Sequence, residues 1–101
     1  MDFQMSGDVL HEVRRVLQDR QSAGLSDTEV EQLAAGITKG VDDFLNSHRN
    51  VEFTLEQVLD AVDSRLRMAG TIAPDADEAK LEAVHDATDA ATRYAVERMS
   101  A

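Results

Sequence analysis

Two stretches of the chain share one pattern: Leu25-Ser26-Asp27-Thr28-Glu29-Val30 and Phe53-Thr54-Leu55-Glu56-Gln57-Val58. Each consists of an apolar residue, a hydroxyl residue, two spacers, Glu or Gln, and Val. In such a capping box the hydroxyl accepts a hydrogen bond from the amide three residues on, and the Glu or Gln side chain accepts one from the amide of the hydroxyl residue. The pattern therefore predicts helices that begin directly after Ser26 and Thr54.

Apolar residues recur at helical spacing after both starts and in two further segments. Such a repeat gathers apolar side chains on one side of a helix. It predicts four helices, over about residues 8–23, 27–47, 55–69 and 75–99. Gly24 and Gly70 follow the first and third segments, where a left-handed residue ends many helices. The predicted fold class is all-α, a small four-helix domain with bundle-like or orthogonal packing.

The last predicted helix differs from the others in composition. Pro74 suits the first turn of a helix, and the acidic residues that follow it complement the helix dipole, so we expect this helix to begin near residue 74 or 75. Its apolar face has few large side chains and is rich in alanine and threonine. Small side chains place such a helix at the edge of the domain, or let another helix come close, from this chain or from a second copy.

Length and composition bound the class of protein. The chain has 101 residues, no cysteine, 43% hydrophobic and 30% charged residues, which is typical of one folded domain, 1–101, without disulfides. No apolar run approaches the about 18 residues of a membrane span. The first residues also lack the basic and apolar regions of a signal peptide. We therefore expect a cytoplasmic protein that does not contact membranes.

The charge is strongly acidic, with 20 acidic and 10 basic residues and a formal net charge of −10. This charge repels a phosphate backbone, so direct binding of nucleic acid is disfavoured. Net charge also serves solubility in general. Two interpretations of the acidity stay open, an adaptation to salt or solubility and a binding surface.

A row of carboxylates follows one side of the last predicted helix, opposite its apolar face. At 3.6 residues per turn, successive members are about 5–6 Å apart, close to the spacing of nucleic-acid phosphates. We predict that this row is a partner-binding site, and it would suit the imitation of nucleic acid. The alternative is that the row is the solvent-exposed face of an amphipathic helix. Arg93 continues the same row, and its positive charge weighs against mimicry. The predicted residues are Asp75, Glu78, Glu82, Asp86 and Asp89.

Candidate catalytic and metal-binding residues are few. Glu82 and His85 match the Glu-x-x-His element of di-iron bundles, a site that needs a second such pair and two further glutamates. The other candidate pair, Asp8 and His11, is expected to lie opposite the apolar face of its helix, and His48 fits a helix C-terminus. The sequence has no Gly-rich phosphate loop and no cysteine nucleophile. We predict no catalytic, metal or cofactor site.

Gly36 and Gly40 lie inside the second predicted helix, where each costs about 1 kcal/mol relative to alanine. Their spacing suits the close approach of another helix backbone. We expect that neighbour to be a helix of the same fold, with a subunit interface as the alternative.

Residues 25–38 resemble the opening of LuxR-type helix-turn-helix domains, in which a Leu-Thr/Ser start leads through an aliphatic stripe to Gly-Leu/Ile-Thr/Ser. The resemblance covers 14 residues. In that family a short second helix and a basic recognition helix follow. Here Val41, Phe44 and Leu45 continue the first helical repeat and two aspartates intervene, so no DNA-contacting residue is carried over.

These observations favour a non-enzymatic protein–protein interaction module, a small acidic adaptor or assembly factor that binds a protein partner or associates with itself as a homodimer. The alternative is an acidic inhibitor that mimics nucleic acid and blocks a nucleic-acid-binding protein. A DNA-binding regulator is a third class, and it requires the arginines to converge on one face.

Overall fold

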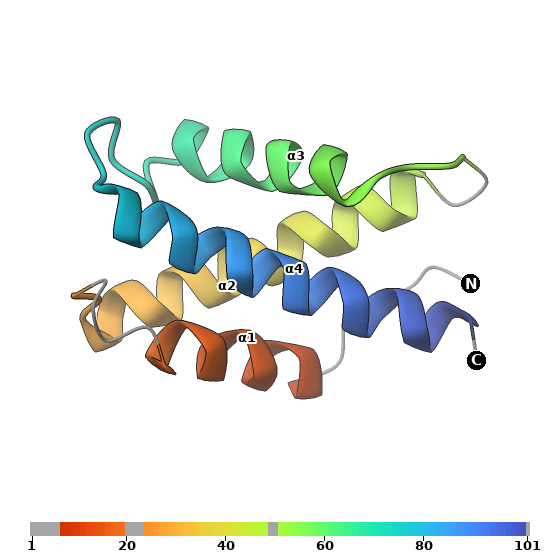
Figure 1. The fold of residues 1–101 in the computed structure, drawn as a ribbon, viewed down its shortest axis with the longest axis horizontal. Coiled ribbons are helices and arrows are strands. Elements are labelled where there is room, and N and C mark those ends of the chain that lie inside the picture. Colours follow the sequence, from red (N-terminus) through yellow and green to blue (C-terminus); the bar gives the residue numbers. More distant parts are fainter. Residues whose placement is uncertain (1–6, 20–23, 49–50, 101) are drawn as a thin grey trace.

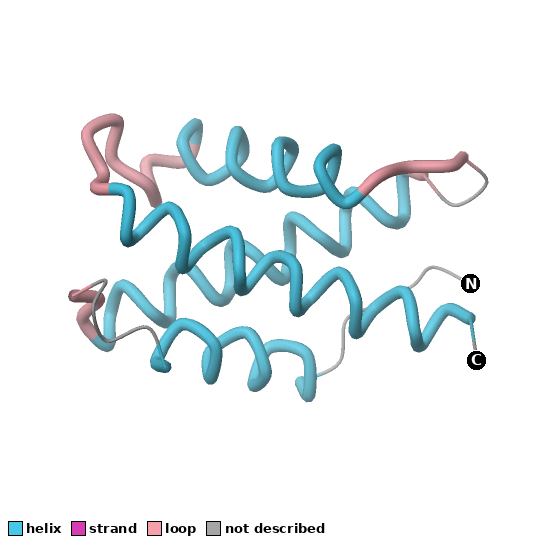
Figure 2. The backbone as a smooth tube through the Cα atoms, in the orientation of Figure 1, coloured by secondary structure: helices cyan, strands magenta, loops and turns pink. Residues whose placement is uncertain are grey.

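The computed structural model describes residues 7–19, 24–48 and 51–100. These residues form four helices: α1 (Gly7–Asp19), α2 (Asp27–Ser47), α3 (Leu55–Met68) and α4 (Glu78–Ser100). Successive helices run in opposite directions (Figure 1), and the connections between them lie at the two ends of the bundle (Figure 2). The predicted all-α four-helix domain is confirmed. The expected end of the first helix, over residues 20–23, lies outside the described residues.

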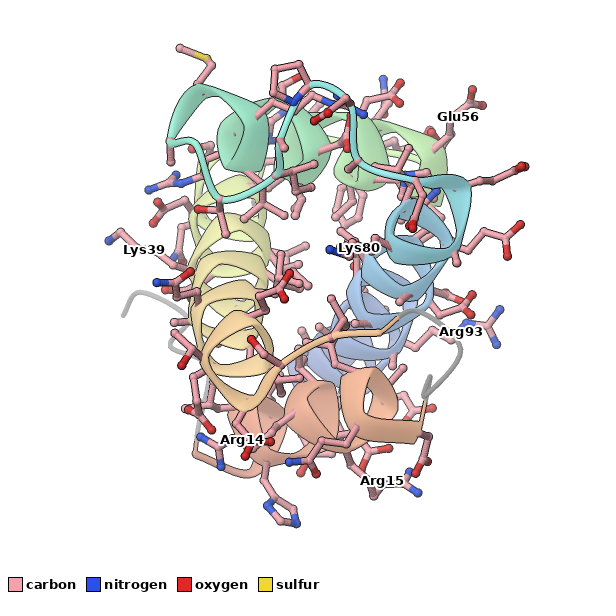
Figure 3. All side chains as sticks on the ribbon, turned by 90° about the vertical axis from the view of Figure 1, so that its left-hand side faces the viewer. Arg14, Arg15, Lys39, Glu56, Lys80 and Arg93 are labelled. Atoms are coloured by element: carbon pink, nitrogen blue, oxygen red, sulfur yellow. The ribbon has the colours of Figure 1, made fainter. Side chains whose placement is uncertain are left out.

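The four helices surround one core when the bundle is viewed from its end (Figure 3). α2 packs against α1, α3 and α4, and α4 packs against α1, α2 and α3. α2 and α4 therefore form a central pair that crosses at an angle (Figure 1), with α1 and α3 on either side. α4 lies among the other helices of its own chain rather than at the edge of the domain.

Both predicted capping boxes are present. The Glu29 amide donates to Ser26 Oγ at 3.2 Å, and the Ser26 amide donates to Glu29 Oε1 at 3.3 Å. At the start of α3, the Gln57 amide donates to Thr54 Oγ1 at 3.2 Å, and the Thr54 amide donates to Gln57 Oε1 at 2.9 Å. α2 and α3 thus begin at the residues that the sequence predicts.

α2 continues without a break through Gly36-Ile37-Thr38 to Ser47. In a helix-turn-helix domain the chain turns at this point. The continuous helix agrees with the apolar repeat that runs on through Val41 and Leu45, both of which are buried. Its C-cap is His48, as expected for a residue at a helix C-terminus.

α4 begins at Glu78, three residues later than expected. Pro74 instead takes the second position of a β-turn, in which the Ala76 amide donates to the Ala73 carbonyl at 3.1 Å. Proline suits this position as well as the first turn of a helix, because its φ matches both. The side chain of Asp77 then accepts from the Lys80 amide at 3.1 Å and caps α4.

Three helices contribute large aliphatic side chains to the core, and the fourth contributes mainly small ones. α1, α2 and α3 contribute buried valine, leucine and isoleucine, whereas α4 contributes an alanine every fourth residue, each fully buried. Next to the alanines, the hydroxyls of Thr88 and Thr92 donate to the carbonyls of Val84 and Thr88, each at 2.8 Å. Because these side chains are small, three helices can pack on this face of α4. The alanines are Ala83, Ala87, Ala91 and Ala95.

Gly36 and Gly40 face α3. A methyl group placed on Gly36 would lie 2.6 Å from Leu66 Cδ2, and one on Gly40 would lie 3.2 Å from Val62 Cγ2. The expectation that these glycines allow close packing within the same fold is confirmed, since only hydrogen fits at Gly36 without movement of Leu66.

Replacing Gly36 by alanine is expected to lower the free energy of unfolding by about 1 kcal/mol. Displacement of the buried Leu66 side chain costs about 1–3 kcal/mol, while removal of a helical glycine returns about 1 kcal/mol. Urea denaturation followed by circular dichroism measures the difference. In a Leu66→Ala background, which removes the obstructing atoms, the same change should stabilise the protein, and an equal loss in both backgrounds would contradict the proposed contact.

Candidate functional site

The predicted carboxylate row is only partly assembled. Glu78 and Glu82 are exposed on the outer face of α4, and Asp86 and Asp89 are half-buried along the same line. Asp75 does not belong to the row, because it lies in the turn before α4 rather than on the helix. Nε of Arg93 donates to Asp89 Oδ1 at 2.8 Å, so this carboxylate is neutralised. The helix brings four of the five residues into line and leaves a shorter acidic stretch than the sequence predicts.

Nearly all cationic side chains that the structure describes are engaged in ion pairs. Three pairs join different helices: Arg14 with Glu31 at 2.7 Å, Arg65 with Asp43 at 2.6 Å, and Lys80 with Glu29 at 3.3 Å. Others lie within one helix, where Arg15 pairs with Glu12, Arg67 with Asp63 and Arg93 with Asp89. Lys39 is the exception among the described cations and points away from the bundle (Figure 3). The arginines that the structure describes are distributed over α1, α3 and α4.

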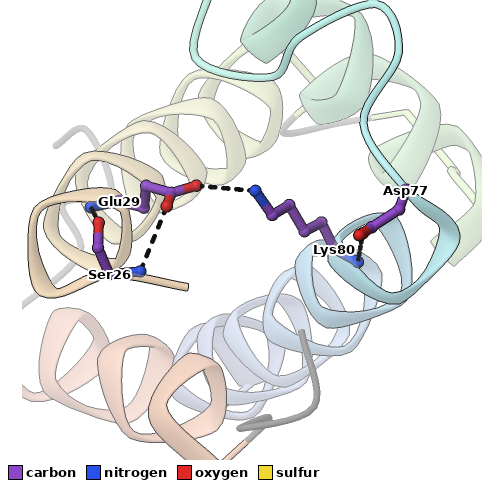
Figure 4. A network of polar contacts seen from close by, with 4 residues as sticks. All are labelled: Ser26, Glu29, Asp77 and Lys80. Carbon is purple, nitrogen blue, oxygen red and sulfur yellow. Dashed lines mark hydrogen bonds and ion pairs between the residues drawn. The ribbon is translucent and has the colours of Figure 1, made fainter. Parts of the chain in front are cut away.

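A pocket of about 380 Å³ lies at the end of the bundle where α2 and α4 begin. Its apolar lining includes Leu33, Ile72 and Val84, and its polar lining includes Glu29 and Lys80. Lys80 extends from α4 across the opening, and its ammonium contacts Glu29 Oε2 at 3.3 Å (Figure 4). The other carboxylate oxygen of Glu29 accepts from the Ser26 amide. The ion pair therefore fastens the N-terminus of α4 to that of α2.

Sequence reasoning missed this ion pair because its partners lie 51 residues apart. Glu29 was recognised only for its local role in the capping box. The ammonium and the carboxylate neutralise each other, so the pair contributes to the joint between two helices rather than to a free acid, base or nucleophile.

The pKa of the Glu29 carboxyl lies below its ordinary value of 4.5, chiefly because the Ser26 backbone amide donates to it and secondly because Lys80 contacts it. A carboxylate held in this way stabilises the fold above its ordinary pKa, and this contribution is lost as the pH falls below 4.5 through the lowered value. We expect ¹³C NMR titration to give a pKa for Glu29 below 4.5. Lys80→Met should raise that pKa without restoring the ordinary value, because the Ser26 amide remains.

Glu12 provides the internal control for this titration. Its pKa is also lowered, but by the hydrogen bond from Arg15 on α1, so Lys80→Met should leave it unchanged. A pKa for Glu29 that does not respond to Lys80→Met would show that the ion pair does not form in solution.

An open apolar groove of about 470 Å³ lies at the opposite end of the bundle, between the start of α3 and the C-terminal half of α4. Leu55 and Val96 remain 37% and 39% exposed there, although both are large aliphatic side chains. Phe53 is half-buried and packs edge-on against Phe44, with ring centroids 5.4 Å apart. Phe44 in turn stacks on His48 at 3.9 Å. This aromatic cluster supports one wall of the groove. The groove is lined by Phe53, Leu55, Thr92, Arg93, Val96 and Glu97.

Three exposed carboxylates on or next to the groove lining, Glu52, Glu56 and Glu97, are called the acidic rim. Glu52 and Glu56 are the sequence neighbours of Phe53 and Leu55, and Glu97 lines the groove itself. All three are exposed, and none has a cationic partner within the described part of the chain. Glu56 and Arg93 point outward on the side where α3 and α4 meet (Figure 3).

The sequence contains one signal for this groove that the periodicity did not capture. Val96 falls outside the series of alanines at every fourth residue that forms the buried face of α4, so its side chain is left exposed to solvent or to a partner. Leu55 is the first apolar residue of the repeat predicted over residues 55–69, yet it is exposed because it occupies the first turn, at the end of the bundle.

The histidines do not assemble into a metal site. Glu82 and His85 are both exposed on α4, and His11 is exposed on α1, while the side chain of Asp8 lies outside the described residues. Among the described residues, no group of three or more His, Asp or Glu side chains is arranged to hold a metal ion. Over the same residues, no helix is long and apolar enough to cross a membrane.

Comparisons with protein-family models, curated proteins and solved structures gave no match for this chain. Its function is therefore inferred from its own surface.

Proposed function

We propose that this chain is a non-enzymatic protein-interaction module, a small acidic adaptor that holds a partner protein in the groove between α3 and α4. One observation carries the proposal: Leu55 and Val96 expose aliphatic surface on either side of an apolar groove. Exposed apolar surface rimmed by polar residues is typical of protein interaction sites. Leu55 and Val96 would provide the central contacts, and the carboxylates would form the rim.

The charges support a protein partner over direct binding of nucleic acid. Nucleic-acid binding needs cations that are free to contact phosphates. Of the cationic side chains described, all but Lys39 are held in ion pairs. Apart from Lys39, the charged side chains left without an ion pair among the described residues are therefore acidic.

Mimicry of nucleic acid has less support than protein binding through the groove. A mimic needs a regular series of negative charges. Asp75 leaves the predicted row, and Arg93 neutralises Asp89, so the series is shortened at both ends. We therefore favour protein binding through the groove over binding of a partner to the carboxylate row.

Affinity capture from the source cells tests the proposal. Tagged wild-type chain and the double variant Leu55→Gln/Val96→Gln are compared, with Met68→Gln as the matched control, because Met68 is an 89% exposed apolar residue at the other end of α3. We expect wild type and Met68→Gln to recover the same protein in fixed ratio, and the double variant to recover at least about tenfold less. Circular dichroism confirms that each variant is folded.

Equal recovery by all three chains would overturn the proposal. A partner that DNA or RNA displaces, and that is lost on Glu78→Gln/Glu82→Gln but not on Leu55→Gln/Val96→Gln, would instead establish the mimic. Such a result would place the binding surface on the outer face of α4.

A further inference from the structure

The charges around the groove restrict what can occupy it. The rim consists of three carboxylates that have no cationic partner among the described residues, while Arg93, the cation among the described lining residues, is engaged with Asp89 at 2.8 Å. An approaching acidic group would be repelled by the rim, whereas a cationic group would find unneutralised carboxylates at the groove edge. Complementary charge of this kind raises the association rate and selects the partner.

A second copy of this chain is a poor occupant for the same reason. Each copy has a formal net charge of −10. Two grooves facing each other would bring both acidic rims together, and like charges across an interface are destabilising. The groove therefore favours a partner of opposite charge over self-association.

The shape of the groove indicates a helical occupant. It lies between the start of α3, which contributes Leu55, and the C-terminal half of α4, which contributes Val96, so an apolar side chain lines it on each side. An amphipathic helix binds such a groove by inserting apolar anchors spaced three or four residues apart. The volume of about 470 Å³ has room for one or two large apolar side chains.

We infer that the groove binds a cationic amphipathic helix of a partner protein. One or two apolar side chains of that helix insert between Leu55 and Val96, and its lysine or arginine residues contact Glu52, Glu56 and Glu97. This inference rests on the proposed function and adds the chemistry of the partner to it.

A pair of synthetic peptides provides the probe. The first is a helical peptide with leucines on one face and lysines on the other, and the second has the same length with glutamate in place of lysine. ¹⁵N–¹H NMR spectra locate binding on the chain, and isothermal titration calorimetry measures the dissociation constant at low and high salt. We expect the lysine peptide to perturb the amides around Leu55 and Val96, to bind more weakly as salt rises, and to bind better than the glutamate peptide.

Two triple variants with the same change in net charge separate specific binding from general attraction to an acidic protein. The rim variant is Glu52→Gln/Glu56→Gln/Glu97→Gln, and the control is Asp75→Asn/Glu78→Gln/Glu82→Gln, whose exposed acids lie outside the groove lining. The rim variant should weaken binding of the lysine peptide by about tenfold. The control should weaken it by less than about threefold.

Three results would overturn the inference. One is equal weakening by both triple variants, which would indicate non-specific attraction. Another is perturbation confined to a surface other than the groove. The third is light scattering that shows a dimer which Leu55→Gln/Val96→Gln converts to monomer, because the groove would then be filled by a second copy.

The inference and the proposed function fail separately. If the protein captured from cells is lost on Leu55→Gln/Val96→Gln but binds the rim variant as tightly as wild type, the groove is the interaction site and its occupant is not cationic. If capture does not depend on Leu55 and Val96, the proposed function fails as well.

Discussion

Replacing Ile37 by alanine is expected to lower the free energy of unfolding by about 2–5 kcal/mol. Ile37 is fully buried at the middle of α2, one of the two helices that pack against all three others. The loss combines the transfer of aliphatic carbons with the cavity left behind, which rigid neighbours fill only in part. Because a domain of this kind is stable by about 5–15 kcal/mol, the substitution removes a large share of the total.

Urea denaturation followed by circular dichroism at 222 nm measures this loss. Lys39→Ala is the control on the same helix, because Lys39 is exposed, and its effect should stay within about 0.5 kcal/mol. A loss below about 1 kcal/mol for Ile37→Ala would mean that α2 does not lie at the centre of the core.

Replacing Ala91 by leucine should destabilise the protein by about 1–3 kcal/mol or more. Ala91 is fully buried on the face of α4 that packs against the other helices, within the series of alanines at every fourth residue. A leucine there needs space that neighbouring helices already occupy, so the helices must separate or adopt strained rotamers. Intrinsic helix propensity cannot account for the loss, because alanine and leucine differ little in it.

Glu82→Leu is the matched control for Ala91→Leu. It adds a leucine to the same helix, but on the exposed outer face. We expect its free energy of unfolding to stay within about 0.5 kcal/mol of wild type. If both leucines are tolerated equally, the alanine face of α4 is not packed closely.

The fold was predictable because its signals are local. The two capping boxes place Ser26 and Thr54 within hydrogen-bonding reach of residues three positions away, so the sequence alone locates the starts of α2 and α3. The start of α4 was placed too early because Pro74 is compatible with both a turn and a first helical turn. The side chain of Asp77, three residues after Pro74, caps α4 and thereby determines where the helix begins.

The candidate site was much less predictable because it depends on contacts between segments that are distant in the chain. The groove joins Leu55 to Val96, and the ion pair at the other end joins Glu29 to Lys80. The acidic row, by contrast, was visible in the sequence because helical spacing alone aligns it. In the structure, Asp75 lies outside the row and Asp89 pairs with Arg93. Helical periodicity alone predicts neither feature.

The alternating direction of the helices has a consequence for the rate of folding. The contacts between α1 and α2, α2 and α3, and α3 and α4 join neighbours along the chain, whereas the contact between α1 and α4 joins its two ends. Helical bundles fold within microseconds to milliseconds. Closing the α1–α4 contact carries the largest loop entropy, so we expect it to form after the main barrier. Val13→Ala, which weakens the buried face of α1, should then accelerate unfolding in stopped-flow experiments and leave the refolding rate nearly unchanged.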